Sequence, residues 1–352
     1  MKGPWRTSRE PESALRRLAL LPLSAASRLV EGGARIHRFL YERGVLGGVA
    51  FPGHVLSVGG LSVGGSGKTP LAAWIAAALR DRGRRVALLS RGYGRRGREK
   101  VVVVSDGRFV RGRIESCGDE PMLLAGHAAG VPVLVGRDRS LADLRALSAF
   151  GSELLVLDDG FQHHRLKRRI DVVALDGGQG FGNRRLLPRG PLREPLRALR
   201  CADALAIVDG PLPREEESIL DRYAPLAYRV AVRRRPVALH PLVRGAPAAA
   251  SSIGGLQVGL LSGIARPESF RATVEGLGAS VVAERIFPDH HRYRERDLFG
   301  LRRLAPLWIT TEKDAIKILP SWVNDLDLFA LILELDVDSP RSFLDWLESQ
   351  LR

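Results

Sequence analysis

The stretch "SVGGSGKT", residues 62–69, constrains the fold more than any other part of the chain. The short apolar run "HVLSV" precedes it and the helical pattern "PLAAWIAAALRDRG" follows it. The stretch nearly matches G-x-x-x-x-G-K-[ST], the phosphate-binding loop, with Ser62 in place of the first glycine. Because such a loop joins a strand to a helix in a helix-flanked sheet, it predicts an α/β fold with a P-loop NTPase core.

The residue types in this loop meet the requirements of nucleotide binding. Its three glycines let successive backbone N–H groups turn towards phosphate oxygens. Lys68 adds a positive charge for the outer phosphates, and Thr69 adds a hydroxyl for Mg²⁺. We therefore expect ATP and Mg²⁺ at this loop. The nucleotide-binding residues we expect are Ser62, Val63, Gly64, Gly65, Ser66, Gly67, Lys68 and Thr69.

Apolar runs alternate with helical patterns through most of the chain. The runs that follow the loop are "RVALLS", "KVVVVS", "VPVLVG", "ELLVLDD", "IDVVALD" and "ADALAIVDG". Near-continuous Val, Leu and Ile strands are typical of a parallel sheet buried beneath helices. The Asp106-Gly107 pair predicts a hairpin, and therefore an antiparallel excursion, after the second of these runs.

The pattern changes near residue 228, where a basic, proline-bearing and then small-residue-rich stretch indicates a joint. Strand and helix patterns resume beyond it and end in the helix pattern "PRSFLDWLESQLR". We therefore expect a helical segment over residues 1–45, a P-loop domain over 46–230 and a smaller α/β domain over 231–352.

Composition narrows the classes of partner. The formal net charge of +15 indicates an anionic partner: nucleic acid, an acidic membrane surface or a phosphorylated small molecule. Aromatic residues make up 6% of the chain, and single-strand nucleic-acid grooves usually place several among their charges. A phosphorylated small molecule or lipid therefore ranks above nucleic acid. Cys117 and Cys201 have no metal-ligand spacing and fit a reducing cytosol.

The N-terminal pattern "SALRRLALLPLSAASRLV" is basic and then apolar. Its apolar run is shorter than the ~20 residues that span a bilayer. A secretory signal would separate the nucleotide loop from ATP, so we exclude that interpretation. This pattern does not favour either of two remaining interpretations. The segment is either a helix packed on the protein or a basic amphipathic helix at an anionic leaflet, with Arg6, Arg9, Arg16, Arg17 and Arg28 facing head groups.

Acidic residues at a strand end are candidates for the metal site. Asp158 and Asp159 end the run "ELLVLDD", and two adjacent carboxylates are costly to hold together without a cation. The neighbouring His163 and His164 point different ways and lack a third zinc ligand at suitable spacing. A magnesium site at Thr69, Asp158 and Asp159 is therefore the metal hypothesis.

Three further stretches have both a structural and a functional interpretation. Asp119 and Glu120 open a helical pattern, where acids are common because they favour the helix dipole. "SRGYGRRGREK" is either a solvated loop or an anion-binding rim. "FPDHHRY" contains either a polar turn or residues for proton transfer.

A GTPase interpretation fails on two signatures. A D-x-x-G switch ending at Gly160 would need an aspartate where Leu157 stands. A guanine-reading [NT]-K-x-D would need one residue between Lys313 and Asp314, and there is none. ATP is therefore the expected nucleotide.

Taken together, these stretches resemble the tetraacyldisaccharide 4′-kinase (lipid A 4′-kinase) family over most of the chain. The matching segments, in the family's order, are "VGGLSVGGSGKTP", "SRGYGRR", "GDEP", "VLDDGFQHHRL", "FGNRRLLPRGPLREP", "GIARPESF", "FPDHHRY" and "TTEKDAIK". The family carries serine or threonine where Ser62 stands, so this departure from the general loop pattern is expected.

The resemblance implies an enzyme that transfers the γ-phosphate of ATP to the 4′-hydroxyl of a tetraacyldisaccharide 1-phosphate, in lipid A biosynthesis. It implies an anionic glycolipid substrate and an N-terminal membrane-associated helix at the cytosolic face of the bacterial inner membrane. It does not indicate an oligomeric state.

The resemblance also implies roles for individual residues. Asp119 and His290 correspond to the family's acid–base pair, with His291 the alternative to His290. Residues implied in the cleft or at the acceptor are Tyr93, Arg95, Glu120, Arg193 and Glu194.

Two other functional classes remain as alternatives. One is a membrane-associated P-loop ATPase without a small-molecule acceptor, which a stoichiometric phosphorylated lipid product would exclude. The other is a non-catalytic nucleotide-binding module on nucleic acid. Competition by anionic lipid micelles, but not by oligonucleotides, would argue against it.

Overall fold

A computed structural model describes residues 20–92, 95, 97, 99–136, 139–243, 245–323 and 325–352. Their strands form one continuous mixed sheet in the order β11-β10-β12-β13-β8-β7-β6-β1-β5-β2-β4-β3, with β9 paired to β8. The strands are β1 His54–Gly59, β2 Val86–Ser90, β3 Val101–Asp106, β4 Pro132–Gly136, β5 Leu154–Asp158, β6 Ile170–Asp176, β7 Ala204–Val208, β8 Tyr228–Pro241, β9 Ala248–Ala249, β10 Gln257–Ser262, β11 Ser280–Ile286, β12 Leu307–Thr311 and β13 Leu328–Val337.

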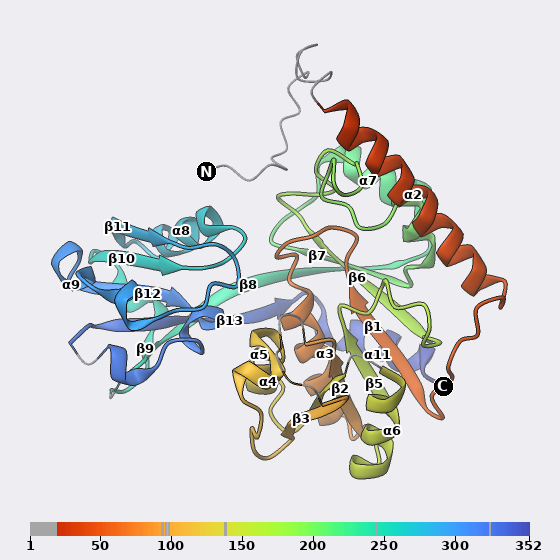
Figure 1. Ribbon diagram of the computed structural model, residues 1–352, viewed down its shortest axis with the longest axis horizontal. Helices are drawn as coiled ribbons and strands as arrows, with labels where there is room; N and C mark the ends of the chain where they lie inside the picture. Colours follow the sequence, from red (N-terminus) through yellow and green to blue (C-terminus); the bar gives the residue numbers. More distant parts are fainter. Residues whose placement is uncertain are drawn as a thin grey trace.

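Helices cover both faces of this sheet (Figure 1). The α-helices are α2 Leu21–Glu42, α3 Lys68–Asp81, α4 Ile114–Cys117, α5 Asp119–His127, α6 Arg139–Phe150, α7 Arg214–Tyr223, α8 Pro267–Gly276, α9 Leu301–Leu304, α10 Glu312–Ala315 and α11 Pro340–Gln350. Short 3-10 helices lie at Leu196–Cys201, Ala250–Ile253, Glu295–Leu298 and Pro320–Trp322.

The half of the sheet that contains the phosphate loop is parallel, as expected from its apolar runs. β1 pairs in parallel with β5 on one side and with β6 on the other. Every residue of β2, β5 and β6 is buried, which explains why these strands lack the alternation of a half-exposed sheet. The expected antiparallel excursion is β3, which pairs antiparallel with β4 and turns back at Asp106-Gly107.

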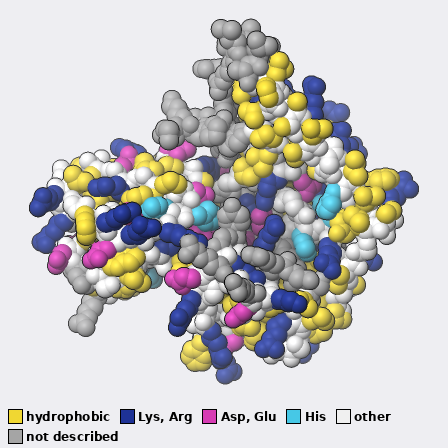
Figure 2. All heavy atoms as spheres, viewed as in Figure 1, with side chains coloured by type: hydrophobic (Ala, Val, Ile, Leu, Met, Phe, Trp, Pro, Cys, Tyr) yellow, Lys and Arg dark blue, Asp and Glu magenta, His cyan; other side chains and the backbone are white. Residues whose placement is uncertain are grey.

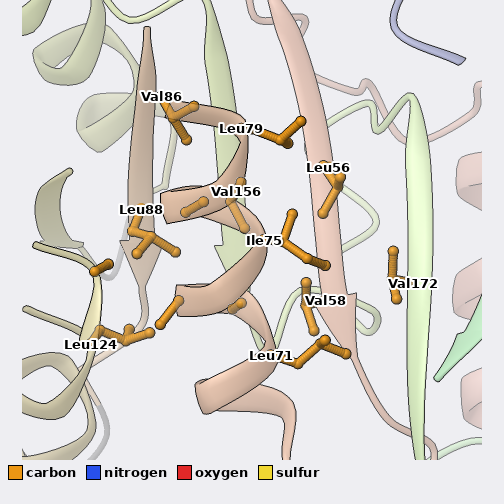
Figure 3. Packing of buried hydrophobic residues seen from close by; sticks show 14 of the residues in the cluster. Leu56, Val58, Leu71, Ile75, Leu79, Val86, Leu88, Leu124, Val156 and Val172 are labelled. Atoms are coloured by element: carbon orange, nitrogen blue, oxygen red, sulfur yellow. The ribbon is translucent and has the colours of Figure 1, made fainter. Parts of the chain in front are cut away.

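Helix α3 anchors the phosphate loop to this sheet (Figure 3). Its apolar residues Leu71, Ile75 and Leu79 are fully buried and face the sheet. Burying each such side chain contributes about 1.5–3 kcal/mol, so the start of the helix has little freedom to move. Gly83 follows the last turn in the left-handed region, at φ +85°, and ends the helix.

A long two-stranded ribbon joins the two halves of the molecule (Figure 1). β8 spans 14 residues and pairs antiparallel with β13. The predicted boundary between residues 230 and 231 therefore falls inside a strand, and much of the stretch predicted as a joint belongs to this ribbon. β8 tolerates Pro236 because the register shifts by one residue there, at a bulge.

The last helix also differs from the predicted division. α11 belongs by sequence to the smaller unit, but Phe343 and Leu347 are buried in the core beneath α3. Phe343 stacks on Trp74 and Tyr228, with ring centroids 6.4 and 5.6 Å apart. The chain therefore returns to the P-loop unit, because the apolar face of α11 finds its partner there.

Helix α2 lies along the outside of the P-loop unit (Figure 1). The Ser27 hydroxyl donates to the carbonyl of Leu186 and accepts from the backbone N–H of Arg189. Within the described residues, no helix is long and apolar enough to cross a bilayer. The four arginines predicted to face head groups before Arg28 lie outside the described residues.

Candidate active site

The phosphate loop has the geometry that its sequence predicts. Gly64 and Gly67 adopt left-handed conformations, with φ of 109° and 79°, which turn the backbone around the loop. Helix α3 begins at Lys68, directly after the loop. Burial lowers the pKa of the Lys68 ammonium, and its Nζ lies 3.3 Å from the Gly64 carbonyl oxygen. The lysine is therefore folded over the loop where phosphate oxygens would lie.

Residues 191–193 run alongside the start of this loop. The Val63 N–H donates to the Pro191 carbonyl over 2.8 Å, and the Arg193 N–H donates to the Leu61 carbonyl over 2.6 Å. The segment places Arg193 and the buried Glu194 beside the nucleotide site. The "LREP" residues, which the resemblance implied for the cleft, therefore lie next to the phosphate loop.

The two adjacent aspartates after β5 have different partners. Asp158 is buried, and both its carboxylate oxygens lie near the Thr69 hydroxyl, at 3.2 and 3.4 Å. Asp159 instead accepts two hydrogen bonds from the Arg193 guanidinium, at 2.6 and 2.7 Å. Asp159 has a left-handed backbone, with φ of 50°, which turns the two side chains apart.

The donor set around Asp158 fits Mg²⁺. Burial, together with the negative charges of Glu120 and Asp159, raises the pKa of Asp158 to about 7. A bound cation would relieve this unfavourable environment, because it favours the ionised carboxylate. Magnesium commonly takes one or two carboxylates together with phosphate oxygens and water. Across the described part of the chain, no group of three or more His, Cys, Asp or Glu residues is arranged so that it could hold a metal ion by itself.

A second cluster joins the P-loop unit to the smaller unit. Asp119, at the start of α5, is 7% exposed, and its Oδ2 lies 2.9 Å from Nδ1 of His290. Asp119 Oδ1 accepts the backbone N–H of Glu120 over 3.0 Å. The hydrogen bond with His290 and the positive charge of Lys313 lower the pKa of Asp119 against the effect of its burial, so the carboxylate stays ionised at neutral pH.

The structure distinguishes between the two histidines that the sequence left open. His290 has a left-handed backbone, with φ of 60°, and faces Asp119. His291 lies within the smaller unit, where its Nε2 is 3.0 Å from Asp297 and its ring stacks on Phe287. His290 is therefore the histidine in contact with Asp119.

Two residues near these clusters were not predicted. Lys313 contacts His290 Nε2 at 3.2 Å, although its motif "TTEKDAIK" had suggested no role for it. Arg38 of α2 forms an ion pair with Glu194, and its guanidinium lies over the Phe161 ring. Their positions depend on contacts between segments far apart in the chain, for which a single sequence carries no signal.

The structure places the remaining predicted residues, Glu120 and Arg95, in different surroundings. Burial raises the pKa of Glu120. The negative charges of Asp119 and Asp159 add to this rise, and the positive charge of Lys313 opposes it. Arg95 is buried and donates to the Glu99 carbonyl over 2.7 Å, so it braces its own loop. Tyr93 lies outside the described residues.

A sequence model of the LpxK family, tetraacyldisaccharide-1-P 4′-kinase, matches residues 16–352. This chain belongs to that family. The family resemblance of the motifs is thereby confirmed. The P-loop and the Asp119–His290 cluster therefore lie in a protein with the fold of this kinase family.

Curated relatives and a solved structure agree with this assignment. The tetraacyldisaccharide 4′-kinase of Anaeromyxobacter sp. (strain Fw109-5) is 42% identical over 330 residues, covering 90% of this chain and 88% of the relative. That of Syntrophus aciditrophicus is 39% identical over 342 residues, covering 92% and 91%. A crystal structure of LpxK from Aquifex aeolicus in complex with ATP has a TM-score of 0.75 at 30% identity, covering 96% of this chain and 99% of that one.

Proposed function

We propose that Asp119 is the base with which this chain, an ATP-dependent tetraacyldisaccharide 4′-kinase, activates the hydroxyl of its glycolipid acceptor. The observation that carries the proposal is the partly buried contact between Asp119 and His290, which come from different units of the fold. A carboxylate in this position is ionised and oriented, as a general base must be.

The proposed reaction is an in-line phosphoryl transfer. Asp119 accepts the proton of the 4′-hydroxyl as that oxygen forms a bond to the γ-phosphorus of ATP. The bond between the γ-phosphorus and its bridging oxygen breaks, and ADP leaves. His290 orients the Asp119 carboxylate through the 2.9 Å contact with Oδ2.

The phosphate loop and the acids beside it hold the nucleotide. Lys68 and the loop amides neutralise and orient the phosphates. Thr69 and Asp158 are the residues that would hold Mg²⁺, which offsets charge on the β- and γ-phosphates when it is bound. We assign Asp159 to the positioning of Arg193, because its carboxylate is paired with that guanidinium.

We further propose that α2 lies in the cytosolic surface of the bacterial inner membrane. Leu29 and Ile36 are 78% and 61% exposed and stand seven positions apart, so they share one helix face. Ser27 and Arg38, which dock on the protein, lie on the opposite face. Figure 2 shows the hydrophobic band along α2. An apolar stripe beside a basic protein suits an anionic leaflet, where the glycolipid acceptor is embedded.

The test is a transfer assay with γ-labelled ATP, Mg²⁺ and the detergent-dispersed disaccharide 1-phosphate. We expect the wild type to label the lipid and Asp119→Asn to label it at least ~10²-fold more slowly, the scale of lost general-base catalysis. Asp119→Asn keeps the shape of the side chain, so a loss of rate reports its charge.

The other outcomes are equally informative. Labelled lipid at a similar rate with both proteins would remove Asp119 as the base but keep the kinase. Label released only as inorganic phosphate by the wild type would support the ATPase alternative.

A further inference from the structure

We propose that Lys313 is a positioning residue that opposes a second proton on His290 and helps to hold its single proton on Nδ1, facing Asp119. The inference deepens the proposed function and rests on its assignment of Asp119 as the base. It concerns a residue in the smaller unit that touches the histidine and not the reacting atoms.

The contacts around Lys313 place its ammonium group at one edge of the imidazole. Nζ lies 3.2 Å from Nε2 of His290 and 3.0 Å from Oδ1 of Asp289. The side chain of Lys313 is 20% exposed, so most of it is shielded from water. The lysine therefore bridges the histidine and the aspartate that precedes it.

The backbone that carries Lys313 is held by the neighbouring Asp314. This carboxylate is fully buried and accepts the Gly263 N–H over 2.9 Å and the Thr311 hydroxyl over 2.8 Å. It also pairs with Lys317 at 2.7 Å. Because α10 is fixed in this way, Lys313 reaches His290 from a defined position.

The chemistry of the two partners of His290 decides which of its nitrogens carries the proton. An ammonium group has three donors and no acceptor, so Nε2 must accept the hydrogen bond from Lys313. A neutral imidazole with an accepting Nε2 carries its proton on Nδ1. Nδ1 then donates to Oδ2 of Asp119, across the 2.9 Å contact. The ionised Asp119 carboxylate can only accept, so it already favours the proton on Nδ1, and Lys313 reinforces this tautomer by keeping Nε2 an acceptor.

The charges that face His290 act in opposite directions. On balance the pKa of His290 is raised, chiefly by the hydrogen bond to Asp119, and the negative charge of Asp289 adds to this effect. Burial and the positive charge of Lys313 lower it. Lys313 also lowers the pKa of Asp119, as does the more distant Lys317, and Lys313 acts against the rise in the pKa of Glu120.

The consequence for catalysis is a shift in the acid limb of the pH–rate profile. Asp119 and His290 titrate as a coupled pair, and removing Lys313 removes a positive charge that lowers the pKa of both. The pair would then gain a proton at a higher pH. A doubly ionised imidazolium–carboxylate pair is a weaker base towards the sugar hydroxyl.

The experiment compares Lys313→Met and Lys313→Arg with the wild type by steady-state kinetics across pH 5.5–9. We expect Lys313→Met to lower kcat by ~10-fold or more and to move the acid limb up by about one pH unit, with both KM values within about twofold. Lys313→Arg keeps the charge, so it should return the acid limb to the wild-type position. Arg303→Met, which removes an exposed positive charge from α9, is the matched control and should change neither quantity.

The contrary outcomes are distinct. A lower kcat with an unshifted acid limb would assign Lys313 to packing and overturn the inference, as would wild-type kinetics in Lys313→Met. A raised KM for the lipid with unchanged kcat would make Lys313 a substrate-binding residue. If Asp119→Asn retained full activity, the base assignment itself would fail, whatever Lys313 did.

Discussion

At the scale of single residues, adjacent side chains in this protein have separate roles because the backbone directs them apart. In our proposal Asp158 holds the metal and His290 orients the base Asp119, whereas Asp159 pairs with Arg193 and His291 with Asp297. Asp159 and His290 both occupy the left-handed region, which costs non-glycine residues of order 1–3 kcal/mol. The surrounding hydrogen bonds must offset that cost.

The division between the two aspartates makes a prediction about magnesium. Asp158→Asn should lower turnover by ~10²-fold and raise the Mg²⁺ concentration needed for half-maximal rate, because it removes the carboxylate beside the Thr69 hydroxyl. Asp159→Asn should change the Mg²⁺ requirement less, because its main contact is with Arg193. Magnesium titrations of both variants measure this. Equal shifts in the two variants would show that both aspartates hold the metal.

At the scale of elements, α2 has one face that docks and one face that remains apolar and exposed. The docking face reaches the active site, since Arg38 pairs with Glu194 and the neighbouring Arg193 pairs with Asp159. Burial of Glu194 would raise its pKa, but the hydrogen bond with His164 and the positive charge of Arg38 lower the pKa of this carboxyl group. The helix is therefore anchored to the cleft and not only to the surface.

The exposed face of α2 predicts membrane binding that can be separated from catalysis. The double variant Leu29→Glu, Ile36→Glu should reduce co-sedimentation with anionic vesicles by ~10-fold or more, because it places two charges where we expect acyl chains. Its kcat on detergent-dispersed acceptor should stay within about threefold of wild type. Leu226→Glu, at a 96% exposed site on the same unit, is the control. Equal loss of binding in the control would show a general charge effect.

At the scale of the whole molecule, the smaller unit contacts α5 of the P-loop unit at both ends of the helix. His290 meets Asp119 at its first turn, and Glu312 lies 3.1 Å from His127 at its last turn. Arg266 also donates to the Gly65 carbonyl of the phosphate loop, over 3.0 Å. The β8–β13 ribbon carries the smaller unit and is the element through which the two units could close on substrates.

The His127–Glu312 contact predicts a pH-dependent part of the stability. The hydrogen bond to Glu312 raises the pKa of His127 above its ordinary value of 6.5. Because the pKa of His127 is higher in the folded than in the unfolded protein, the contact stabilises the folded state fully below pH 6.5. This contribution is lost as the pH rises through the raised pKa. Between pH 6 and pH 8, we expect the melting temperature of His127→Gln to fall by about 1–2 °C less than that of the wild type. The exposed His240→Gln is the control. An unchanged pH dependence in His127→Gln would exclude this contact as its source.

The amino-acid sequence by itself determined the parts of this protein that local pattern encodes. The glycine spacing of the phosphate loop, the apolar runs of β1, β5 and β6 and the caps of α3 all require specific residues over a short span. The ordered motifs also identified the family. These predictions are confirmed because turn geometry, burial and propensity act within a few residues.

The tertiary structure decided what depends on distant contacts. It placed His290 against Asp119, 171 positions earlier, and brought Lys313 to the same imidazole. It turned the basic segment around Pro236 into a strand paired with β13, and returned α11 to the first core. The physical reason is that each choice depends on where buried area and charge find a partner in space, and no residue nearby in the sequence supplies that partner.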